Sequence, residues 1–213
     1  VACMPNTIPT VDSAETVRYI IEKAKAAKTK VYPIASVTKG LKGEEICDFA
    51  ELKAAGAIAV SDDGRPVENA ATLAKAMKLA YENGLKVISH CEDLNIIDGG
   101  IINKGEISDV LGVKGMDRLS EDLITAREIT VAATIGVPIH IAHVSTRGSM
   151  EIIRQAVKSG VLVTSETAPH YFSMTDKELL RRDADYRMNP PLREPSDVAA
   201  ITQGIVDGTI DCI

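Results

Sequence analysis

The strongest constraint on the fold of this chain is a repeated order of segments, in which a helical stretch ends at a glycine and an apolar strand follows. Glycine suits the left-handed backbone conformation with which many helices end, and it lets the chain turn directly into a strand. Five glycines stand one or two residues before an apolar run: Gly56, Gly84, Gly136, Gly160 and Gly208. This order predicts strand–helix–strand units and a parallel sheet.

Seven segments are predicted as strands because they are apolar throughout, as strands covered on both faces are. They are residues 2–5, 31–37, 57–61, 86–90, 138–144, 161–166 and 209–213. Helices are predicted from about Asp12 or Ser13, over about 45–55 and 120–135, and near 196–207. The segment 91–117 exceeds ordinary loop length and is predicted to be a functional rim or lid.

These elements predict an α/β fold. A complete (β/α)8 barrel takes about 250 residues, whereas this chain has 213. We therefore expect a TIM-type barrel that is incomplete, with about seven strands, and a single partial barrel domain over residues 1–213. A doubly wound open sheet is the alternative. Its nucleotide-binding version is disfavoured because the turns carry neither GxGxxG nor GxxxxGK[ST].

Composition excludes several classes of partner. The chain has 24 basic and 30 acidic side chains and a formal net charge of −6, which argues against a nucleic-acid duplex or an anionic membrane as the main partner. No run of 18 apolar residues predicts a membrane span. The four cysteines form no CxxC pair, so we expect reduced thiols and a cytoplasmic location.

Polar side chains gather where the predicted strands end, which is where α/β barrels place their catalytic groups. Asp63 follows the third strand, His90 ends the fourth and His143 ends the fifth. Zinc takes histidine nitrogen and aspartate oxygen, and a catalytic zinc keeps one position open for water. Zinc also lowers the pKa of that water to about 7. Asp63, His90 and His143 are therefore the candidate metal ligands.

Each candidate has a simpler interpretation. Asp63 precedes a glycine and can shape a turn, and His90 can donate to a carbonyl. His140 lies three residues before His143, so in a regular strand the two side chains face opposite ways. We expect His143 to face inward and His140 to pack toward the helices. His170, in a Pro-His turn, either supports the site or is merely exposed.

Two asparagines are candidate substrate-binding residues, because an amide N–H can donate to a carboxylate or carbonyl. Asn6 follows the first strand and Asn189 precedes Pro190. As alternatives, Asn6 forms a turn and Asn189 is an extended residue before proline. Segment 187–193 contains two prolines and two arginines, which suits a fixed loop over an anionic substrate.

Seven short motifs, taken together, resemble the dihydroorotases of the amidohydrolase superfamily, of the bacterial type that often works with aspartate transcarbamoylase. The motifs are MPNTIP at 4–9, SDDG at 61–64, SHCED at 89–93, AHVST at 142–146, SETAPH at 165–170, MNPPLR at 188–193 and GTIDCI at 208–213. The resemblance implies a barrel that holds one or two zinc ions. It also implies the interconversion of N-carbamoyl-L-aspartate and dihydroorotate in pyrimidine synthesis.

The same resemblance assigns roles to residues. Asp63 resembles the carboxylate that replaces a carbamylated lysine of related enzymes, and His90 and His143 resemble the imidazole ligands of the second metal position. Asn6 and Asn189 resemble substrate-binding residues. A related dihydropyrimidinase or allantoinase would usually carry lysine where Asp63 stands. A non-catalytic barrel that only scaffolds aspartate transcarbamoylase is the other alternative.

Two elements of the family pattern fall outside the sequence. The HxH pair and the arginine of the family's first strand would precede Val1, and the general-base aspartate is expected just beyond Ile213. The chain therefore resembles an interior part of the enzyme. We expect residues 1–213 alone to be inactive, because no general base is then within reach of the substrate, and to bind zinc weakly at best. Unpaired sheet edges make homo-oligomers plausible.

Overall fold

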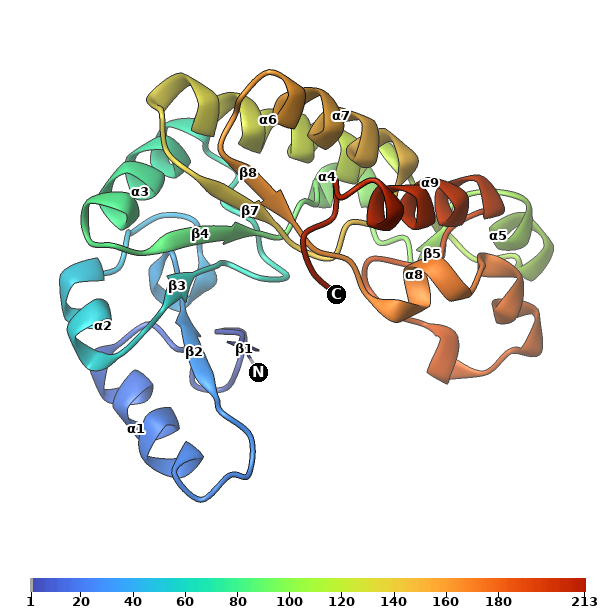
Figure 1. Cartoon of the computed structure of the whole chain (residues 1–213). Helices are drawn as coiled ribbons and strands as arrows, with labels where there is room; N and C mark the ends of the chain where they lie inside the picture. Colours follow the sequence, from blue (N-terminus) through green and yellow to red (C-terminus); the bar gives the residue numbers. More distant parts are fainter. Residues whose placement is uncertain (1) are drawn as a thin grey trace. The chain divides into compact units, whose positions relative to one another are not determined.

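The computed structural model describes residues 2–213 and has the predicted α/β architecture (Figure 1). Its internal contacts divide it into two compact units. The first unit comprises the described residues up to His90 together with Thr130–His140, and the second comprises Cys91–Ile129 and Ile141–Ile213. Among the described residues, no helix is both long and apolar enough to cross a membrane.

The main sheet has six strands in the order β1-β2-β3-β4-β7-β8. The first four pair in parallel, with Ala2 beside Tyr32, Ile34 beside Ala59 and Val60 beside Val87. The strand bounds are β1 (Ala2–Cys3), β2 (Tyr32–Ala35), β3 (Ala59–Val60), β4 (Lys86–Ser89), β7 (Ile139–Ile141) and β8 (Val163–Ser165). Six of the seven predicted strands are therefore present.

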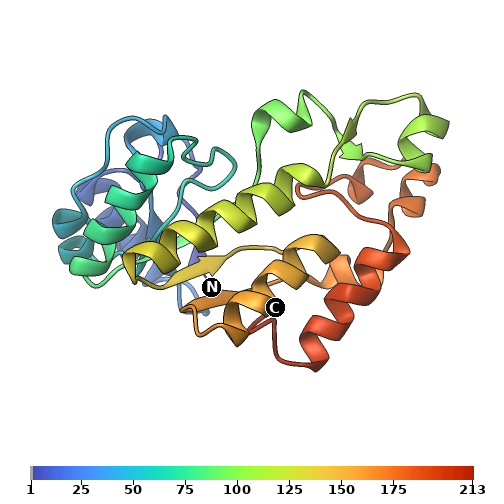
Figure 2. The same ribbon diagram turned by 90° about the horizontal axis from the view of Figure 1, so that it is seen from above.

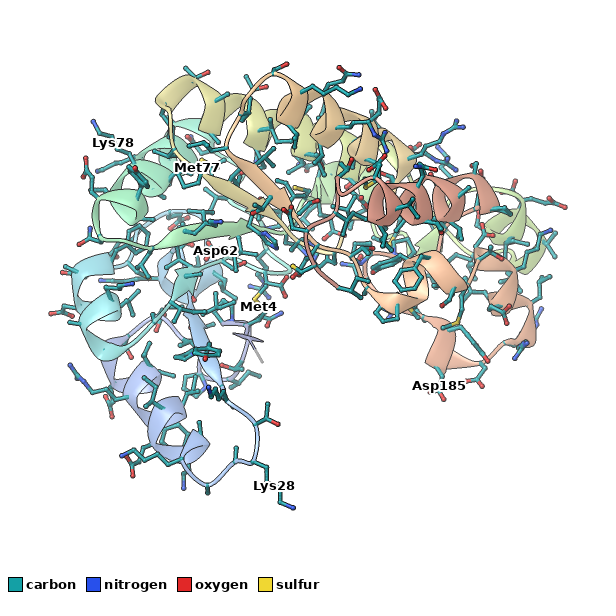
Figure 3. The ribbon with its side chains drawn as sticks, in the orientation of Figure 1. Met4, Lys28, Asp62, Met77, Lys78 and Asp185 are labelled. Atoms are coloured by element: carbon teal, nitrogen blue, oxygen red, sulfur yellow. The ribbon has the colours of Figure 1, made fainter. Side chains whose placement is uncertain are left out.

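The helices of the first unit begin at residues whose side chains accept backbone N–H bonds, as N-caps do. Ser13, Asp48 and Asn69 cap α1 (Ala14–Ala24), α2 (Phe49–Ala55) and α3 (Ala70–Glu82). Helix α3 packs on β4. Met77 on this helix is buried and Lys78 is exposed (Figure 3), which is the separation expected of an amphipathic helix on a sheet.

The second unit contains, among others, α7 (Arg147–Lys158), α8 (Pro169–Ser173) and α9 (Pro195–Val206), and α9 packs against both α7 and α8 (Figure 2). Helix α6 covers Leu119–Ile135. The helices predicted over 120–135 and near 196–207 are thus confirmed within one residue at each end.

The seventh predicted strand, residues 209–213, does not form one. This segment makes only an isolated parallel bridge between Glu166 and Cys212. Asp211 N donates to Ser165 O at 2.9 Å and Thr167 N donates to Cys212 O at 3.2 Å. The segment therefore follows β8 in the direction expected of a next strand, but too few residues pair to make a strand.

Segment 91–117, predicted to be a functional rim or lid, contains secondary structure that was not predicted. The segment contains α4 (Leu94–Ile97), β5 (Ile102–Asn103), α5 (Glu106–Leu111) and β6 (Gly115–Met116), and β5 pairs with β6 in parallel. Ile102 and Ile107 form a small core with Leu179, which comes from a 3-10 helix at Asp176–Arg181. Leu179, about 70 residues further along the sequence, covers the two isoleucines. Local composition therefore did not reveal these short helices and strands.

All five glycines that were predicted to end helices have positive φ. Gly56 ends α2 with φ +110°, and a Cβ built at this position would lie 2.4 Å from Cδ1 of Ile21. Gly136 has φ +70° and nothing within 4 Å of such a Cβ. Gly56 is therefore required both by its backbone conformation and by a close neighbour, and Gly136 by conformation alone.

Gly56→Ala is expected to lower the free energy of unfolding by about 2 kcal/mol, and Gly136→Ala by about 1 kcal/mol, because the second exchange adds only left-handed strain. Urea denaturation of both variants measures the difference. Equal losses would show that the contact with Ile21 relaxes at no cost.

Candidate metal and substrate site

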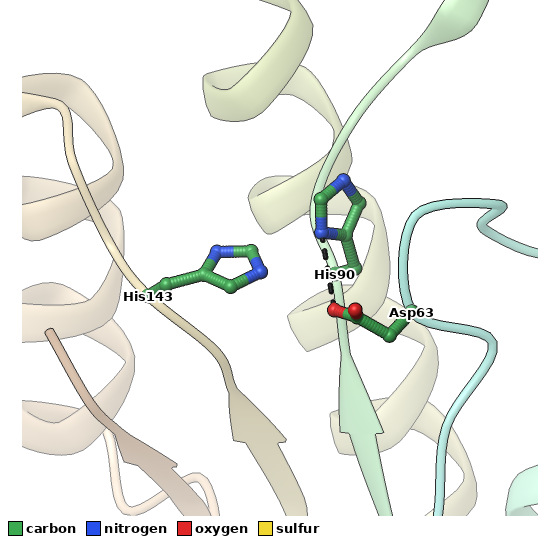
Figure 4. A group of neighbouring side chains, drawn as sticks. All are labelled: Asp63, His90 and His143. Atoms are coloured by element: carbon green, nitrogen blue, oxygen red, sulfur yellow. Dashed lines mark ion pairs between the residues drawn. The ribbon is translucent and has the colours of Figure 1, made fainter. Parts of the chain in front are cut away.

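Asp63 and His90 lie together in the first unit, each just past the end of a strand. Asp63 follows β3 in the turn at residues 61–64, and His90 directly follows β4. His90 Nδ1 lies 3.4 Å from Asp63 Oδ1 (Figure 4). Both side chains are shielded, at 4% exposure for His90 and 17% for Asp63. Parallel neighbouring strands thus bring an imidazole and a carboxylate to the same end of the sheet.

The neighbouring carboxylate of Asp62 holds this turn in place. Asp62 is buried and accepts hydrogen bonds from Val37 N at 2.8 Å and Thr38 N at 3.0 Å, and from the Thr38 hydroxyl. Burial raises the pKa of Asp62, and the hydrogen bonds from Thr38 and Val37 oppose that shift. Asp62 therefore fixes the backbone beside Asp63 and is itself directed into the protein.

Asn6 lies against Asp63. Its Nδ2 donates to Asp63 Oδ2 at 2.8 Å, and the asparagine side chain is exposed. The two oxygens of Asp63 are thus used differently, since Oδ1 is the one near His90. Asn6 keeps a second amide hydrogen and its carbonyl oxygen for other partners.

His143 lies in the second unit, two residues after the end of β7. It has φ +36°, an uncommon conformation for a residue other than glycine and one that is enriched at functional sites. The strand was expected to continue regularly through this position. Because it ends at Ile141, alternation along a strand does not set the direction of the His143 ring.

Asp63 and His90 thus offer two possible ligand atoms within the first unit, and His143 offers its imidazole from the loop that follows β7 in the second unit. His140, which was expected to pack toward the helices, lies within β7 and is half-buried. The choice of His143 over His140 as a ligand stays a prediction.

His170 lies in the second unit, half-buried in α8, with its ring 4.1 Å from the ring of Tyr171. Burial lowers the pKa of His170, and the His143 imidazole lowers it further. His170 is therefore not fully exposed, and its two interpretations, support of the site or a place at the surface, stay open.

Asn189 is exposed and is followed by the buried Pro190 and Pro191. Tyr171 Oη donates to Pro190 O at 2.7 Å, which ties the segment carrying Asn189 to α8. The expectation that both arginines of segment 187–193 face an anionic substrate is corrected, because Arg193 is buried and forms an ion pair with Glu121 at 3.2 Å. Sequence reasoning did not identify Glu121, since no spacing links it to Arg193.

Asp62→Ala is expected to lower the free energy of unfolding by about 2–4 kcal/mol, because two buried backbone N–H groups and a hydroxyl lose their acceptor. Asp62→Asn keeps an acceptor oxygen and should cost less. Chemical denaturation of the two variants checks the order. A loss for Asp62→Ala below about 1 kcal/mol would show that water replaces the carboxylate.

Comparison with known proteins identifies the family of this chain. Residues 1–149 match the model of the family described as dihydro-orotase-like. Dihydroorotases from Trichlorobacter lovleyi and Citrifermentans bemidjiense are 49% and 50% identical over 214 residues, which cover 100% of this chain and 50% of each relative. The chain thus spans about half the length of the curated relatives it matches.

Solved structures show the fold. An L-hydantoinase (dihydropyrimidinase) from Arthrobacter aurescens superimposes with a TM-score of 0.80 at 19% identity, over 99% of this chain and 48% of that one. A dihydropyrimidinase from Brevibacillus agri superimposes with a TM-score of 0.74 at 20% identity, over 98% and 47%. The fold is therefore that of an incomplete TIM-type barrel, as predicted. By its match to the family model over residues 1–149, this chain belongs to the dihydro-orotase-like family.

Proposed function

We propose that Asp63, His90 and His143 bind zinc, and that residues 1–213 supply this part of the active site of a dihydroorotase. The observation that carries the proposal is the pairing of a carboxylate oxygen and an imidazole nitrogen, Asp63 Oδ1 and His90 Nδ1, which lie 3.4 Å apart just past the ends of β3 and β4. Near-complete burial of His90 and the positive φ of His143 support it, because shielded and strained residues are typical of functional sites.

The donor set fits zinc. Zinc–nitrogen and zinc–oxygen bonds are about 2.0–2.2 Å long, so two ligands of one tetrahedral ion lie about 3.3–3.5 Å apart. His90 Nδ1 and Asp63 Oδ1 lie 3.4 Å apart, which matches that separation and is longer than a good hydrogen bond. The other oxygen of Asp63 receives its hydrogen bond from Asn6, as ligating carboxylates usually receive one.

When bound, zinc supplies a Lewis acid that polarises a carbonyl oxygen and acidifies water. The residues of this chain hold the metal-binding carboxylate and orient the substrate. Asn6 fixes Asp63 through one amide hydrogen and can donate the other to the substrate. Asn189 is exposed on a segment stiffened by two buried prolines, and we assign to it a hydrogen bond donated to the substrate carboxylate or ring.

The reaction proposed for the whole enzyme is the reversible opening of the dihydroorotate ring amide to N-carbamoyl-L-aspartate in pyrimidine biosynthesis. The likeness of the chain to dihydroorotases over its full length supports this substrate. Proton transfer to the leaving nitrogen is assigned to the aspartate expected beyond Ile213. Aspartate transcarbamoylase as a partner, a homo-oligomeric assembly and a cytoplasmic location are part of the same proposal and rest on the family resemblance and on composition.

Metal titration of the 213-residue chain tests the ligands. Co²⁺, whose visible absorption reports ligand number, is expected to bind weakly but measurably at high metal concentration, and Zn²⁺ to displace it. Asp63→Asn, His90→Gln and His143→Gln should each weaken binding more than the roughly 10–100-fold that is typical of changes around metal ligands. The exposed Asp185 provides the control Asp185→Asn, which should bind as the unchanged chain does. Equal binding by all four variants would refute the site.

Turnover tests the reaction. The isolated chain is expected not to open dihydroorotate. A chimera that joins residues 1–213 to the flanking segments of the Trichlorobacter lovleyi dihydroorotase should open it, and Asp63→Asn in that chimera should remove the activity. The relative itself serves as the positive control. Turnover by the isolated chain would contradict the expected need for the flanking groups, and a folded, metal-loaded but inactive chimera would contradict the assignment of substrate.

A further inference from the structure

In the second unit, all three side-chain nitrogens of the buried Arg193 contact other groups of the protein. Arg193 Nη2 contacts Glu121 Oε2 at 3.2 Å, Nε donates to Ser145 Oγ at 3.0 Å, and Nη1 donates to Asn103 Oδ1 at 3.1 Å. The side chains of Arg193 and Glu121 are only 4% and 5% exposed. Neither group is therefore available to a substrate.

Glu121 also holds the backbone that follows His143. Its carboxylate accepts from Ser145 N at 2.8 Å and from Thr146 N at 3.0 Å, and it contacts the hydroxyl of Ser145. Thr146 in turn caps the first turn of α7, because its hydroxyl accepts from Ser149 N. The peptide two residues after His143 is thus fixed between a buried carboxylate and a helix terminus. Such anchoring maintains a strained φ at a non-glycine residue.

Arg193 ends the segment that carries Asn189. The backbone of Arg193 accepts from Asp176 N at 2.9 Å, and Leu192 beside it is fully buried. Glu121, Arg193 and Asn189, together with Pro190 and Pro191, line a cavity of about 10 Å³, which has room for about one water molecule. Little space therefore remains for the segment to shift relative to Glu121.

The chemistry of the Arg193–Glu121 ion pair favours a role in positioning neighbouring groups over a role in stability. A buried ion pair is often no more stabilising than apolar residues of similar volume, because both charges lose their hydration. A guanidinium, however, presents several donors in one rigid plane, which lysine does not. Arg193 uses this plane to join Glu121, Ser145 and Asn103 at fixed distances.

We propose that the Arg193–Glu121 pair is a positioning device that sets His143 and Asn189 together, one through the 145–146 backbone and the other through segment 188–193. The proposal rests on the function proposed above for His143 and Asn189. Neither member of the pair touches substrate or metal.

Co²⁺ affinity of the 213-residue chain is the main test. Arg193→Met is expected to weaken binding about 10-fold, in the range typical of changes around metal ligands, and Arg193→Lys to restore only part of the loss. Arg181, exposed at 63% and paired with Glu178, provides the control Arg181→Met, which should leave the affinity unchanged. Should Arg193→Met fail to fold, Arg193→Lys carries the comparison.

The double variant Glu121→Gln with Arg193→Met separates positioning from stability. It removes both buried charges but keeps an acceptor oxygen for Ser145 N and Thr146 N, so its urea midpoint should return toward that of the unchanged chain while its Co²⁺ affinity stays low. Recovery of affinity together with stability, or affinity of Arg193→Met within twofold of the unchanged chain, would overturn the proposal.

Backbone amide NMR shifts keep the two proposals distinguishable. Arg193→Met should move the amides of residues 143–146 and of 188–189 together, and Arg181→Met should move neither set. If the unchanged chain binds no metal, the proposed function fails, and the positioning proposal is decided by these shifts alone. Movement confined to residues 188–189 would refute it.

Discussion

Buried carboxylates that accept backbone N–H groups past the strand ends are the interaction on which the rest of the structure depends. A chain leaving a parallel sheet carries N–H groups that no neighbouring strand can satisfy, and an unsatisfied buried donor costs about 1–3 kcal/mol. Asp62 accepts from Val37 and Thr38, and Glu121 accepts from Ser145 and Thr146. Both carboxylates also contact the hydroxyl of a residue they anchor. The two units therefore satisfy the backbone N–H groups past their strand ends in the same way.

This anchoring explains how candidate ligands on loops past the strand ends can be held in fixed positions. Asp63 stands directly beside Asp62, and His143 lies two residues before Ser145. Two of the three candidate ligands are therefore adjacent to a backbone segment held by a buried charge. Rigid placement of donor atoms matters for a metal site because ligand geometry, more than residue type, determines which ion binds.

The fold was largely predictable from sequence because its signals are local. The glycines at helix ends, the capping residues and the uniformly apolar strands each act within a few neighbouring residues, and they predicted six strands and the main helices correctly. The short helices and strands of segment 91–117 were not predicted because their core depends on Leu179, far along the chain. Segment 209–213 was mispredicted as a full strand because its composition is apolar while its pairing is a single bridge.

The candidate site was likewise predictable only in part. Asp63, His90 and His143 could be named as candidates from sequence because few residue types bind zinc and because strand ends converge, and within the first unit Asp63 Oδ1 and His90 Nδ1 lie 3.4 Å apart. The role of Arg193 could not be inferred. Its contact with Glu121 joins residues 72 apart in sequence, and an arginine beside prolines is equally compatible with an exposed, anion-binding side chain.

The charge balance inside the second unit constrains how its sequence can vary. An exchange of Arg193 or of Glu121 alone would leave one ion in the interior without its counter-ion, which is far more costly than the absence of both. We therefore expect the two positions to differ between functional homologues only as a pair, or to be separated by intermediates that another substitution compensates. Engineering of the neighbouring segment 188–193 would have to begin from both residues at once.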